Sequence, residues 1–488
     1  MKKYHYLLLF LSLCTGLLLR LYHLSSPVAD WHSYRQVDTA SVTKNFLNNG
    51  VNLLIPTYHN LSPDQSGLDN PQGLRMVEFP LYNLMSWFTI KLTGLSVDIA
   101  SRLTSIVLSL FSSLFIFIFV FSLTSKFTPA FLAILSFLLL PFNIYYSRTI
   151  LPENAAVFFM TLSLVLFRFH PILSSIFLSL SALCKPFTLL LTLPIFIFLF
   201  FRFKKTKNIN KLLKIIVFSL ISLVPLFLWR HWIQAFPEGI PASAWLLNFS
   251  DKRIFPEWYR GYHVDFLNQI LILRPYWWRW LILERISLLI LGAFGLIPVT
   301  LGLFYQKFNI NVINFLGFIG IFLYFVFVPG GNIQHDYYQI LIIPFISISL
   351  GCGFYYLLYF TLPAKFLSLC LILIISAFSL FFSAEKILPY YQINRPEIVS
   401  AGKKVDELTP KNSIIIAPYL GDTALLYQTN RPGFPIEIYD IAKTKKLFPN
   451  QPLYLVSVNF DSYTNQLIKL YPALFKSDQF IILDLQND

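Results

Sequence analysis

The sequence predicts an all-α polytopic membrane protein that ends in a small α/β domain. Its 488 residues are 56% hydrophobic and only 13% charged, whereas a soluble domain carries about 25% charged residues. The mean hydropathy is +0.62. The apolar residues gather in runs of about twenty, which is the length that a transmembrane helix requires.

We predict about eleven transmembrane helices from these apolar runs, all within a membrane domain at residues 1–385. The first run follows a basic start, but it lacks a small-residue cleavage site and contains Arg20, so we interpret it as an uncleaved helix. The segment 79–95 is an alternative span, but its length and its initial motif "EFPLY" favour a helix on the membrane surface. The predicted spans are 5–24, 99–122, 127–145, 152–168, 171–185, 187–203, 212–230, 282–304, 311–328, 339–361 and 365–384.

The basic residues predict a cytoplasmic N-terminus. Short cytoplasmic loops are typically rich in Lys and Arg. The short loops on the same side of the membrane as the N-terminus contain many such residues and no Asp or Glu. This pattern explains the net charge of +14 without nucleic acid, and it permits contacts with lipid headgroups. The basic residues are Lys2, Lys3, Lys126, Arg168, Arg202, Lys204, Lys205, Lys207, Lys211, Lys214, Lys307 and Lys365.

The same orientation places the 24 acidic residues on or near the outer face. Three large polar segments also lie outside: 25–98, 231–281 and a soluble domain at 386–488. The four cysteines lie in or beside apolar runs, so we interpret them as small buried residues. We therefore expect an integral protein of a prokaryotic inner or plasma membrane. Its reaction would take place on the outer face of that membrane.

The C-terminal segment predicts strands that alternate with helices. "SIIIAP", "PLYLVSVN" and "FIILDL" are short apolar runs bounded by turn residues, and "DTALLYQTN" and "SYTNQLIKLYP" are helix-like. This order favours a mainly parallel sheet. Because the segment lacks a Gly-rich phosphate loop, a structural or docking role is expected for it.

Residues 29–46, "ADWHSYRQVDTASVTKNF", place unusual polar chemistry directly after the first apolar run. Ser33 and Gln36 have the spacing of a capping box, which predicts a helix that begins at Ser33 and ends near Gly50. Arg35 and Asp38 are three residues apart and can form an ion pair on that helix. In a purely structural interpretation, Asp30 stabilises the start of the helix, and Arg35 and Asp38 form an ion pair at the membrane interface.

Other charged residues recur at the outer ends of the predicted spans, where a charge is costly unless it is paired or used. Arg148 and Glu153 lie in the short loop "SRTILPEN", and they could simply pair at a helix start. Lys185, in "ALCKPFTL", could snorkel to the interface. A lone Lys on the outer side runs against the charge bias, so we favour a phosphate contact.

Two further outer segments carry candidate binding residues. The loop "PGGNIQHDYYQI" contains His335, Asp336 and Tyr337, for which substrate positioning is more consistent than a metal site. The segment 231–281 is rich in Trp, Tyr and Arg, including Arg274. Aromatic rings and arginines suit sugars and phosphates, and they are equally typical of anchoring at the membrane interface.

The order of these motifs resembles that of the protein O-mannosyltransferase-like membrane glycosyltransferases, which include the aminoarabinose transferases that modify lipid A. The resemblance rests on the acidic motif after the first span, "EFPLY", "SRTILPEN", "KPFTLLLTLP" and "HDYYQI", and it covers roughly residues 1–385. It implies the type C glycosyltransferase fold, a catalytic Asp in the first outer loop and a polyprenyl-phosphate sugar donor.

The chain departs from this family at the catalytic position. Many relatives carry adjacent Asp and Glu in the first loop, whereas this chain has "ADWHSYRQVDTA". An ungapped alignment of "ASVTKNFLNNG" with the helix of the relatives puts Arg35 where their Asp lies, while Asp30 better fits the distance from the first span. The base is therefore Asp30 or Asp38, and we favour Asp30.

By this resemblance, the base would take a proton from an acceptor hydroxyl or amine. Lys185 and an arginine of segment 231–281 would stabilise the leaving phosphate. The acceptor itself is not specified by the sequence. Glu153 or Asp336 would hold a divalent metal or orient the acceptor, and the metal requirement stays open. The residues assigned to substrate binding are His32, Arg35, Glu78, Arg148, Glu153, Lys185, Arg274, His335, Asp336 and Tyr337.

Three other classes compete with this interpretation. A transporter or flippase would have polar residues within its spans and interrupted helices in two matching halves. We find no clear internal repeat, and the charges gather at one face. A polysaccharide polymerase or ligase also uses a lipid-linked donor on that face, so the sequence separates it poorly. A membrane scaffold without catalysis is the third.

The predicted orientation can be tested with reporter fusions. We expect a reporter after Asn210 to lie in the cytoplasm and a reporter after Gln486 to lie outside, because the loops rich in Lys and Arg stay inside. A phosphatase active only outside and a fluorescent protein active only inside provide the two measurements. If both positions report the same side, the number of spans is wrong.

Overall fold

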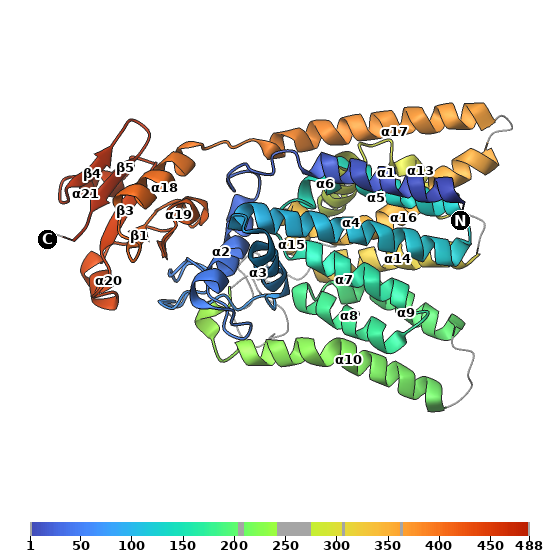
Figure 1. Cartoon of the computed structure of the whole chain (residues 1–488), viewed down its shortest axis with the longest axis horizontal. Coiled ribbons are helices and arrows are strands. Elements are labelled where there is room, and N and C mark those ends of the chain that lie inside the picture. The colour runs from blue at the N-terminus through green and yellow to red at the C-terminus, as the bar shows by residue number, and fades with distance from the viewer. Residues whose placement is uncertain (1, 204–208, 242–274, 305–307, 362–364, 487–488) are drawn as a thin grey trace. The chain divides into compact units, whose positions relative to one another are not determined.

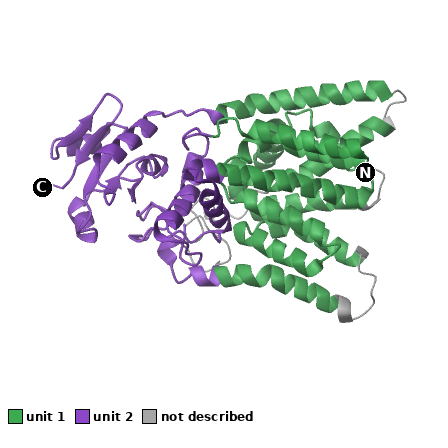
Figure 2. Cartoon of the chain, viewed as in Figure 1, with its two compact units in different colours: residues 1–24, 102–229, 257–390 green, residues 25–101, 230–256, 391–488 purple. Residues whose placement is uncertain are grey.

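The computed structural model describes residues 2–203, 209–241, 275–304, 308–361 and 365–486, which form two compact units (Figures 1 and 2). Unit 1 comprises 1–24, 102–229 and 257–390. Unit 2 comprises 25–101, 230–256 and 391–488. Each unit therefore combines segments that lie far apart in the sequence.

Unit 1 is a bundle of apolar helices (Figure 1). Helices α4 and α10 begin or end in unit 2. The elements are α1 (Lys3–Arg20), α4 (Val97–Thr124), α5 (Phe127–Leu139), α6 (Pro141–Tyr146), α7 (Glu153–Leu166), α8 (Pro171–Cys184), α9 (Thr188–Phe203), α10 (Ile209–Ile233), α12 (Pro275–Arg279), η3 (Trp280–Ile290), α13 (Leu296–Gly302), α14 (Phe308–Phe327), α15 (Pro329–Gln334), η4 (Asp336–Ile342), α16 (Ile343–Tyr356), η5 (Leu357–Thr361), α17 (Lys365–Ile387) and η6 (Leu388–Tyr391).

Within the described residues, five helices are long and apolar enough to cross a membrane, and four more apolar helices are shorter. This confirms a mostly helical membrane protein, while the number of eleven spans stays a prediction. The five are Val97–Thr124, Leu212–Ile233, Ile310–Phe327, Asp336–Tyr359 and Lys365–Tyr391, and the shorter four are Phe127–Leu139, Glu153–Leu166, Pro171–Cys184 and Thr188–Phe201.

The run predicted as one span at 282–304 is instead broken. The π-helix η3 ends at Ile290, a turn follows, and α13 begins at Leu296. Gly292 in the turn has a positive φ of 52°, and a Cβ there would lie 2.0 Å from the carbonyl oxygen of Ser379 in α17. Glycine therefore permits both the turn and the close approach of α17.

Small residues let the other helices of the bundle pack closely. Helix α16 packs against α5 and α13, α7 against α8, and α14 against α9. A Cβ on Gly351 of α16 would lie 2.5 Å from the backbone nitrogen of Ala133 in α5, and one on Gly320 of α14 would lie 2.3 Å from the carbonyl oxygen of Leu191 in α9. Contacts of this kind stabilise helix pairs in membranes, where the hydrophobic effect between helices is weak.

Arg20, which interrupts the first apolar run, is fully buried at the end of α1. Its Nε donates to Ser147 Oγ at 2.6 Å, and its Nη1 donates to the carbonyl oxygens of Gly16 and Leu138 at 3.0 Å each. These hydrogen bonds offset part of the cost of burying the guanidinium. Arg20 thus joins α1 to the residues around α5 and α6.

Unit 2 contains a five-stranded sheet with helices around it (Figure 2). Its elements are α2 (Ser33–Asn49), α3 (Leu81–Thr93), η1 (Pro237–Gly239), α18 (Glu397–Leu408), β1 (Ile414–Ile416), α19 (Ala424–Gln428), β2 (Gly433–Phe434), α20 (Ile441–Leu447), β3 (Leu453–Ser457), α21 (Ser462–Ile468), β4 (Ala473–Lys476) and β5 (Ile481–Asp484).

The prediction of an α/β fold in the C-terminal segment is confirmed, but the prediction of a mainly parallel sheet is not. The strand order is β2-β1-β3-β5-β4. β1 runs parallel to β2 and β3, whereas β5 runs antiparallel to β3 and β4. The last two strands are joined by a short connection rather than a helix, and a short connection reverses the chain.

The first polar segment extends this sheet at its β2 edge. The backbone nitrogen of Gly433 donates to the carbonyl oxygen of His59 at 2.9 Å, and that of Leu61 donates to the carbonyl oxygen of Gly433 at 2.8 Å. Leu61 also packs into the apolar core under the sheet. The edge strand is thereby covered by chain from about 370 residues earlier, and an edge that is covered cannot pair with another molecule.

Candidate functional site

Asp30 lies in the short segment before α2 and lines a cavity of about 330 Å³ within unit 2. Its side chain is largely buried. The amide nitrogen of Gln36 donates to Asp30 Oδ1 at 2.9 Å and to the carbonyl oxygen of Trp31 at 3.1 Å. One side chain of the helix therefore fixes the carboxylate and the backbone beside it.

The predicted helix is confirmed, since α2 runs from Ser33 to Asn49 and Gly50 follows it, but the predicted capping box is wrong. The residue before the helix is His32, which adopts a left-handed φ of 56° and makes no side-chain cap. Gln36, the proposed return partner of Ser33, binds Asp30 instead. The backbone nitrogen of Ser33 donates to the carbonyl oxygen of Asp30 at 3.0 Å.

The predicted Arg35–Asp38 ion pair is also wrong, because each residue has a tertiary partner. Arg35 forms an ion pair with Glu78, the acidic residue of "EFPLY". Asp38 forms one with Arg75, with 3.1 Å between Oδ2 and Nη2. All four residues are largely buried. A buried charge that lacks its partner costs more free energy than an ion pair along one helix contributes, so the tertiary pairs form instead.

Both carboxylate oxygens of Asp38 are engaged within unit 2. Thr423 Oγ1 donates to Oδ1 at 2.7 Å, and Gln65 Nε2 donates to Oδ2 at 3.2 Å, beside Arg75. The side chain of Asp38 is 2% exposed. These contacts join α2 to the start of α19, so the geometry of Asp38 is that of a structural link.

The cavity at Asp30 contains a second acidic residue that sequence reasoning missed. Asp422 lines it, together with His32, Arg395 and Tyr419. Burial, assisted by the charge of Asp38, raises the pKa of Asp422 to about 6, although the backbone nitrogen of Ala424 donates to Asp422 Oδ1. Trp31, which is 42% exposed, also lines the cavity and offers a ring to a ligand.

In unit 1, Glu153 and Lys185 form a buried ion pair with 2.9 Å between Oε1 and Nζ. Glu153 begins α7, and Lys185 follows the last residue of α8. Lys185 Nζ also lies 5.6 Å from the ring centroid of Tyr338. The suggested Arg148–Glu153 pair is therefore wrong: Arg148 is buried, and its Nη1 donates to the carbonyl oxygen of His23 at 3.1 Å. Snorkelling of Lys185 is also wrong, because its side chain is only 8% exposed.

Asp336 is the centre of a second buried cluster in unit 1. Its Oδ2 accepts from Tyr390 Oη at 2.5 Å and lies 3.2 Å from Arg285 Nη1, and its Oδ1 accepts from Tyr146. The neighbouring His335 ring stacks on the largely buried Tyr337, with 5.2 Å between the ring centroids. Asp336 is fully buried, and its described contacts hold α6, η3 and η6 together.

Arg274 lies outside the described residues, so its predicted role stays a prediction. Glu153 and Asp336, named as metal candidates, each face a cation. Among the residues that the structure describes, no group of three or more His, Cys, Asp or Glu side chains could hold a metal ion. The divalent metal therefore stays a prediction.

Several residues of these clusters were not identified from the sequence. Arg75 and Gln65 lie in an irregular polar stretch, and Thr423 and Asp422 come from the C-terminal segment. Arg285 lies inside an apolar run, and a charge at such a position is itself a signal that it has a partner or a function. The partners could not be named, because contacts between residues 27 to 385 positions apart leave no local pattern.

Comparison with solved structures shows where this fold occurs. ArnT from Cupriavidus metallidurans in the apo state superposes with a TM-score of 0.63 at 13% identity, over 97% of each chain. The structure of the same protein bound to undecaprenyl phosphate superposes with a TM-score of 0.62 at 12% identity, also over 97% of each chain. The archaeal oligosaccharyltransferase AglB from Archaeoglobus fulgidus, in complex with an inhibitory peptide and a dolichol-phosphate, gives 0.54 at 11% identity, over 93% of this chain and 69% of that one.

The same Archaeoglobus fulgidus enzyme was also solved in complex with Zn and sulfate, with a TM-score of 0.54 at 11% identity, over 91% of this chain and 67% of that one. No protein-family model matches the sequence, and no curated protein matches it. The type C glycosyltransferase fold expected from the motifs is thus confirmed by structure.

The Glu153–Lys185 pair generates a prediction on stability. Lys185→Met leaves a buried carboxylate without its cation, which costs about 3–5 kcal/mol. We expect a clearly lower midpoint of thermal unfolding in detergent for this variant, and recovery of most of the loss when Glu153→Gln is added. Lys469→Met, at an exposed position, is the matched control and should leave the midpoint unchanged. A double variant as unstable as Lys185→Met would contradict the pairing as the cause.

Proposed function

We propose that this chain is a membrane glycosyltransferase that transfers a sugar from a polyprenyl-phosphate donor to an acceptor hydroxyl or amine on the outer face of the membrane. The observation that carries the proposal is the likeness to ArnT over 97% of both chains, and one of the ArnT structures contains undecaprenyl phosphate. A carboxylate at the expected place, Asp30, lines a cavity directly after the first apolar helix.

In this proposal Asp30 is the general base. The acceptor oxygen or nitrogen attacks the anomeric carbon, the bond from that carbon to the phosphate oxygen breaks, and the polyprenyl phosphate leaves with the electron pair. The acceptor proton passes to Asp30. The hydrogen bond from Gln36 to Oδ1 supports this role because it fixes the direction of the carboxylate.

Asp38 is the less suitable base. A base must bring an oxygen within hydrogen-bond reach of the proton it removes, and the oxygens of Asp38 are occupied by Thr423, Gln65 and Arg75. Asp38 does not line the cavity that contains Asp30. We therefore assign to Asp38 the positioning of α2 and retain Asp30 as the base.

For the leaving phosphate we retain Lys185 as the proposed ligand. Its ion pair with Glu153 and its contact with the Tyr338 ring hold the ammonium group in a fixed place, which favours electrostatic stabilisation of a developing charge. The proposed orientation gives a cytoplasmic N-terminus, a membrane domain at 1–385 and an extracytoplasmic domain at 386–488.

Substitution of the two aspartates separates their roles. We expect Asp30→Asn to reduce turnover by at least a hundredfold, because general-base catalysis contributes about 10²–10⁴-fold, and to leave expression and the unfolding midpoint near wild type. Asp38→Asn should instead lower the unfolding midpoint, because it weakens the pair with Arg75. Wild-type turnover in Asp30→Asn together with loss in Asp38→Asn, at equal folded protein, would move the base to Asp38.

The donor class is the second test. We expect purified protein in nanodiscs to transfer sugar from a synthetic polyprenyl-phosphate sugar and not from the corresponding nucleotide sugar. In the proposed orientation the longest cytoplasmic segment, near 203–211, is too short for a nucleotide-binding domain, and the candidate carboxylates lie on the outer side. The measurement is release of polyprenyl phosphate and mass spectrometry of the product, with Asp30→Asn as the control. Efficient transfer from the nucleotide sugar without lipid carrier would overturn the proposal.

A further inference from the structure

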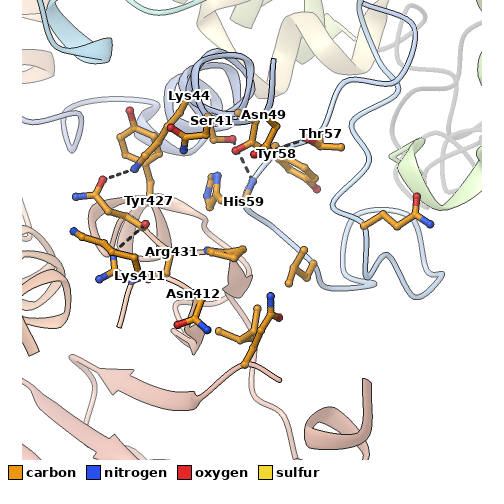
Figure 3. A pocket seen from close by; sticks show the side chains of 18 of the residues that line it. Ser41, Lys44, Asn49, Thr57, Tyr58, His59, Lys411, Asn412, Tyr427 and Arg431 are labelled. Carbon is orange, nitrogen blue, oxygen red and sulfur yellow. Dashed lines mark hydrogen bonds between the residues drawn. The ribbon is translucent and has the colours of Figure 1, made fainter. Parts of the chain in front are cut away.

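A second and larger cavity lies in unit 2, with a volume of about 490 Å³ (Figure 3). Its walls come from the C-terminal half of α2, the segment 57–72 and the part of the C-terminal segment that contains β1 and the turns around it. None of the residues that line it lines the cavity at Asp30. The two cavities thus differ in position as well as in composition.

The distance between the two cavities follows from the length of α2. Tyr34 lines the cavity at Asp30, and Asn48 lines the larger one. An α-helix rises about 1.5 Å per residue, so these two positions on α2 are about 20 Å apart, and Ser41, which also lines the larger cavity, is about 10 Å from Tyr34 along the helix. The two cavities therefore follow one another along α2.

The lining of the larger cavity is polar and contains three cations, Lys44, Lys411 and Arg431. Of the twenty described residues that line it, seven are Asn or Gln and none is Asp or Glu. Amide groups both donate and accept hydrogen bonds, as sugar hydroxyls do. Figure 3 shows Asn49 and Asn412 on different walls of the cavity, so amides approach a ligand from more than one side.

The positive charge of this cavity is balanced only in part. Arg431 and Lys411 both pair with Asp406, which does not line the cavity. Lys44 bonds Asn430, and its Nζ lies 5.6 Å from the ring centroid of Tyr427. Burial lowers the pKa of Lys44 to about 8, although nearby acidic residues oppose this. Asp406 is one carboxylate for three cations, so the cavity keeps a net positive charge beside its amides.

His59 provides an independent sign of a missing partner. It lines the cavity and its side chain is only 7% exposed. Its Nε2 lies 3.4 Å from the carbonyl oxygen of Thr423, while its buried Nδ1 has no hydrogen-bond partner among the described residues. Burial lowers the pKa of His59 to about 4, so the ring is neutral near pH 7. With the proton on Nε2, Nδ1 can accept a hydrogen bond from a hydroxyl group.

Aromatic rings flank this histidine on two sides. The ring centroids of Tyr58 and Tyr427 lie 5.9 Å and 5.8 Å from that of His59, and both contacts are edge-to-face. Both tyrosines line the cavity (Figure 3). An aromatic side chain offers an apolar face with a polar tip, which suits a ring that carries both C–H faces and hydroxyls.

We propose that this cavity is a saccharide-binding site, separate from the site of transfer, that takes a hydroxyl-rich oligosaccharide. The amides of Asn49 and Asn412 bind its hydroxyls from different walls, His59 Nδ1 accepts one further hydroxyl, and Tyr58 and Tyr427 pack against the sugar rings. Such a site would hold a glycan on unit 2 independently of the step at Asp30.

The test is a binding measurement on the full-length protein in nanodiscs. The probes are maltotriose, chitotriose and a trimer of galacturonic acid, and the readout is saturation-transfer NMR followed by isothermal calorimetry. We expect at least one trimer to bind, and Asn49→Ala with Asn412→Ala to weaken it about tenfold, since each hydrogen bond contributes a small free energy. Gln466→Ala with Gln479→Ala, two exposed amides outside the cavity, is the matched control and should bind within twofold of wild type.

His59→Phe should also weaken binding, and if this variant does not fold, the asparagine pair alone decides. Asp30→Asn should bind the trimer as wild type does. Because the measurement reads binding and not transfer, a failure of the proposed glycosyl transfer would leave its result intact. No binding of any of the three trimers, stronger binding of inorganic phosphate than of the trimers, or unchanged affinity in the asparagine variant would overturn the saccharide site.

Discussion

The pairing of buried charge is the constraint on which the rest of this molecule depends. A carboxylate or ammonium that leaves water loses several kcal/mol of solvation, and only a well-placed partner offsets that loss. The chain places Glu153 against Lys185 and Asp336 against Arg285 in its helical unit. It places Asp38 against Arg75 in the other unit. Each pair fixes two segments to one another, since separating them would leave both charges alone.

This constraint also explains why the polar residues can support function. A charge that is held by a buried partner keeps its position without reorganisation, and preorganised charge is what stabilises a transition state. Asp30 accepts a hydrogen bond from the amide of Gln36, and unlike Asp38 it lines a cavity. The fully engaged Asp38 and the cavity-lining Asp30 therefore suit different tasks, although both belong to one short motif.

The sequence predicted the features that depend on composition and local pattern. The mostly helical membrane unit, the helix from Ser33 and the strands in "SIIIAP", "PLYLVSVN" and "FIILDL" were predicted correctly, whereas the run 282–304 is broken and not one span. Local rules failed where a distant group offered a better partner: Gln36 binds Asp30 rather than capping the helix, and Arg35 pairs with Glu78 rather than Asp38. Residues 43 positions apart carry no common pattern that a reader of the sequence could detect.

The C-terminal segment is part of the framework around α2. Its edge strand β2 pairs with residues of the first polar segment, Thr423 binds Asp38, and Asp422 lines the cavity that contains Asp30. The environment of the proposed base is thus completed by residues about 390 positions later in the chain. A change in the C-terminal segment can alter the cavity at Asp30 while the motif "ADWHSYRQVD" stays the same. In the proposed transfer reaction, the C-terminal segment is therefore in a position to influence which acceptor is used.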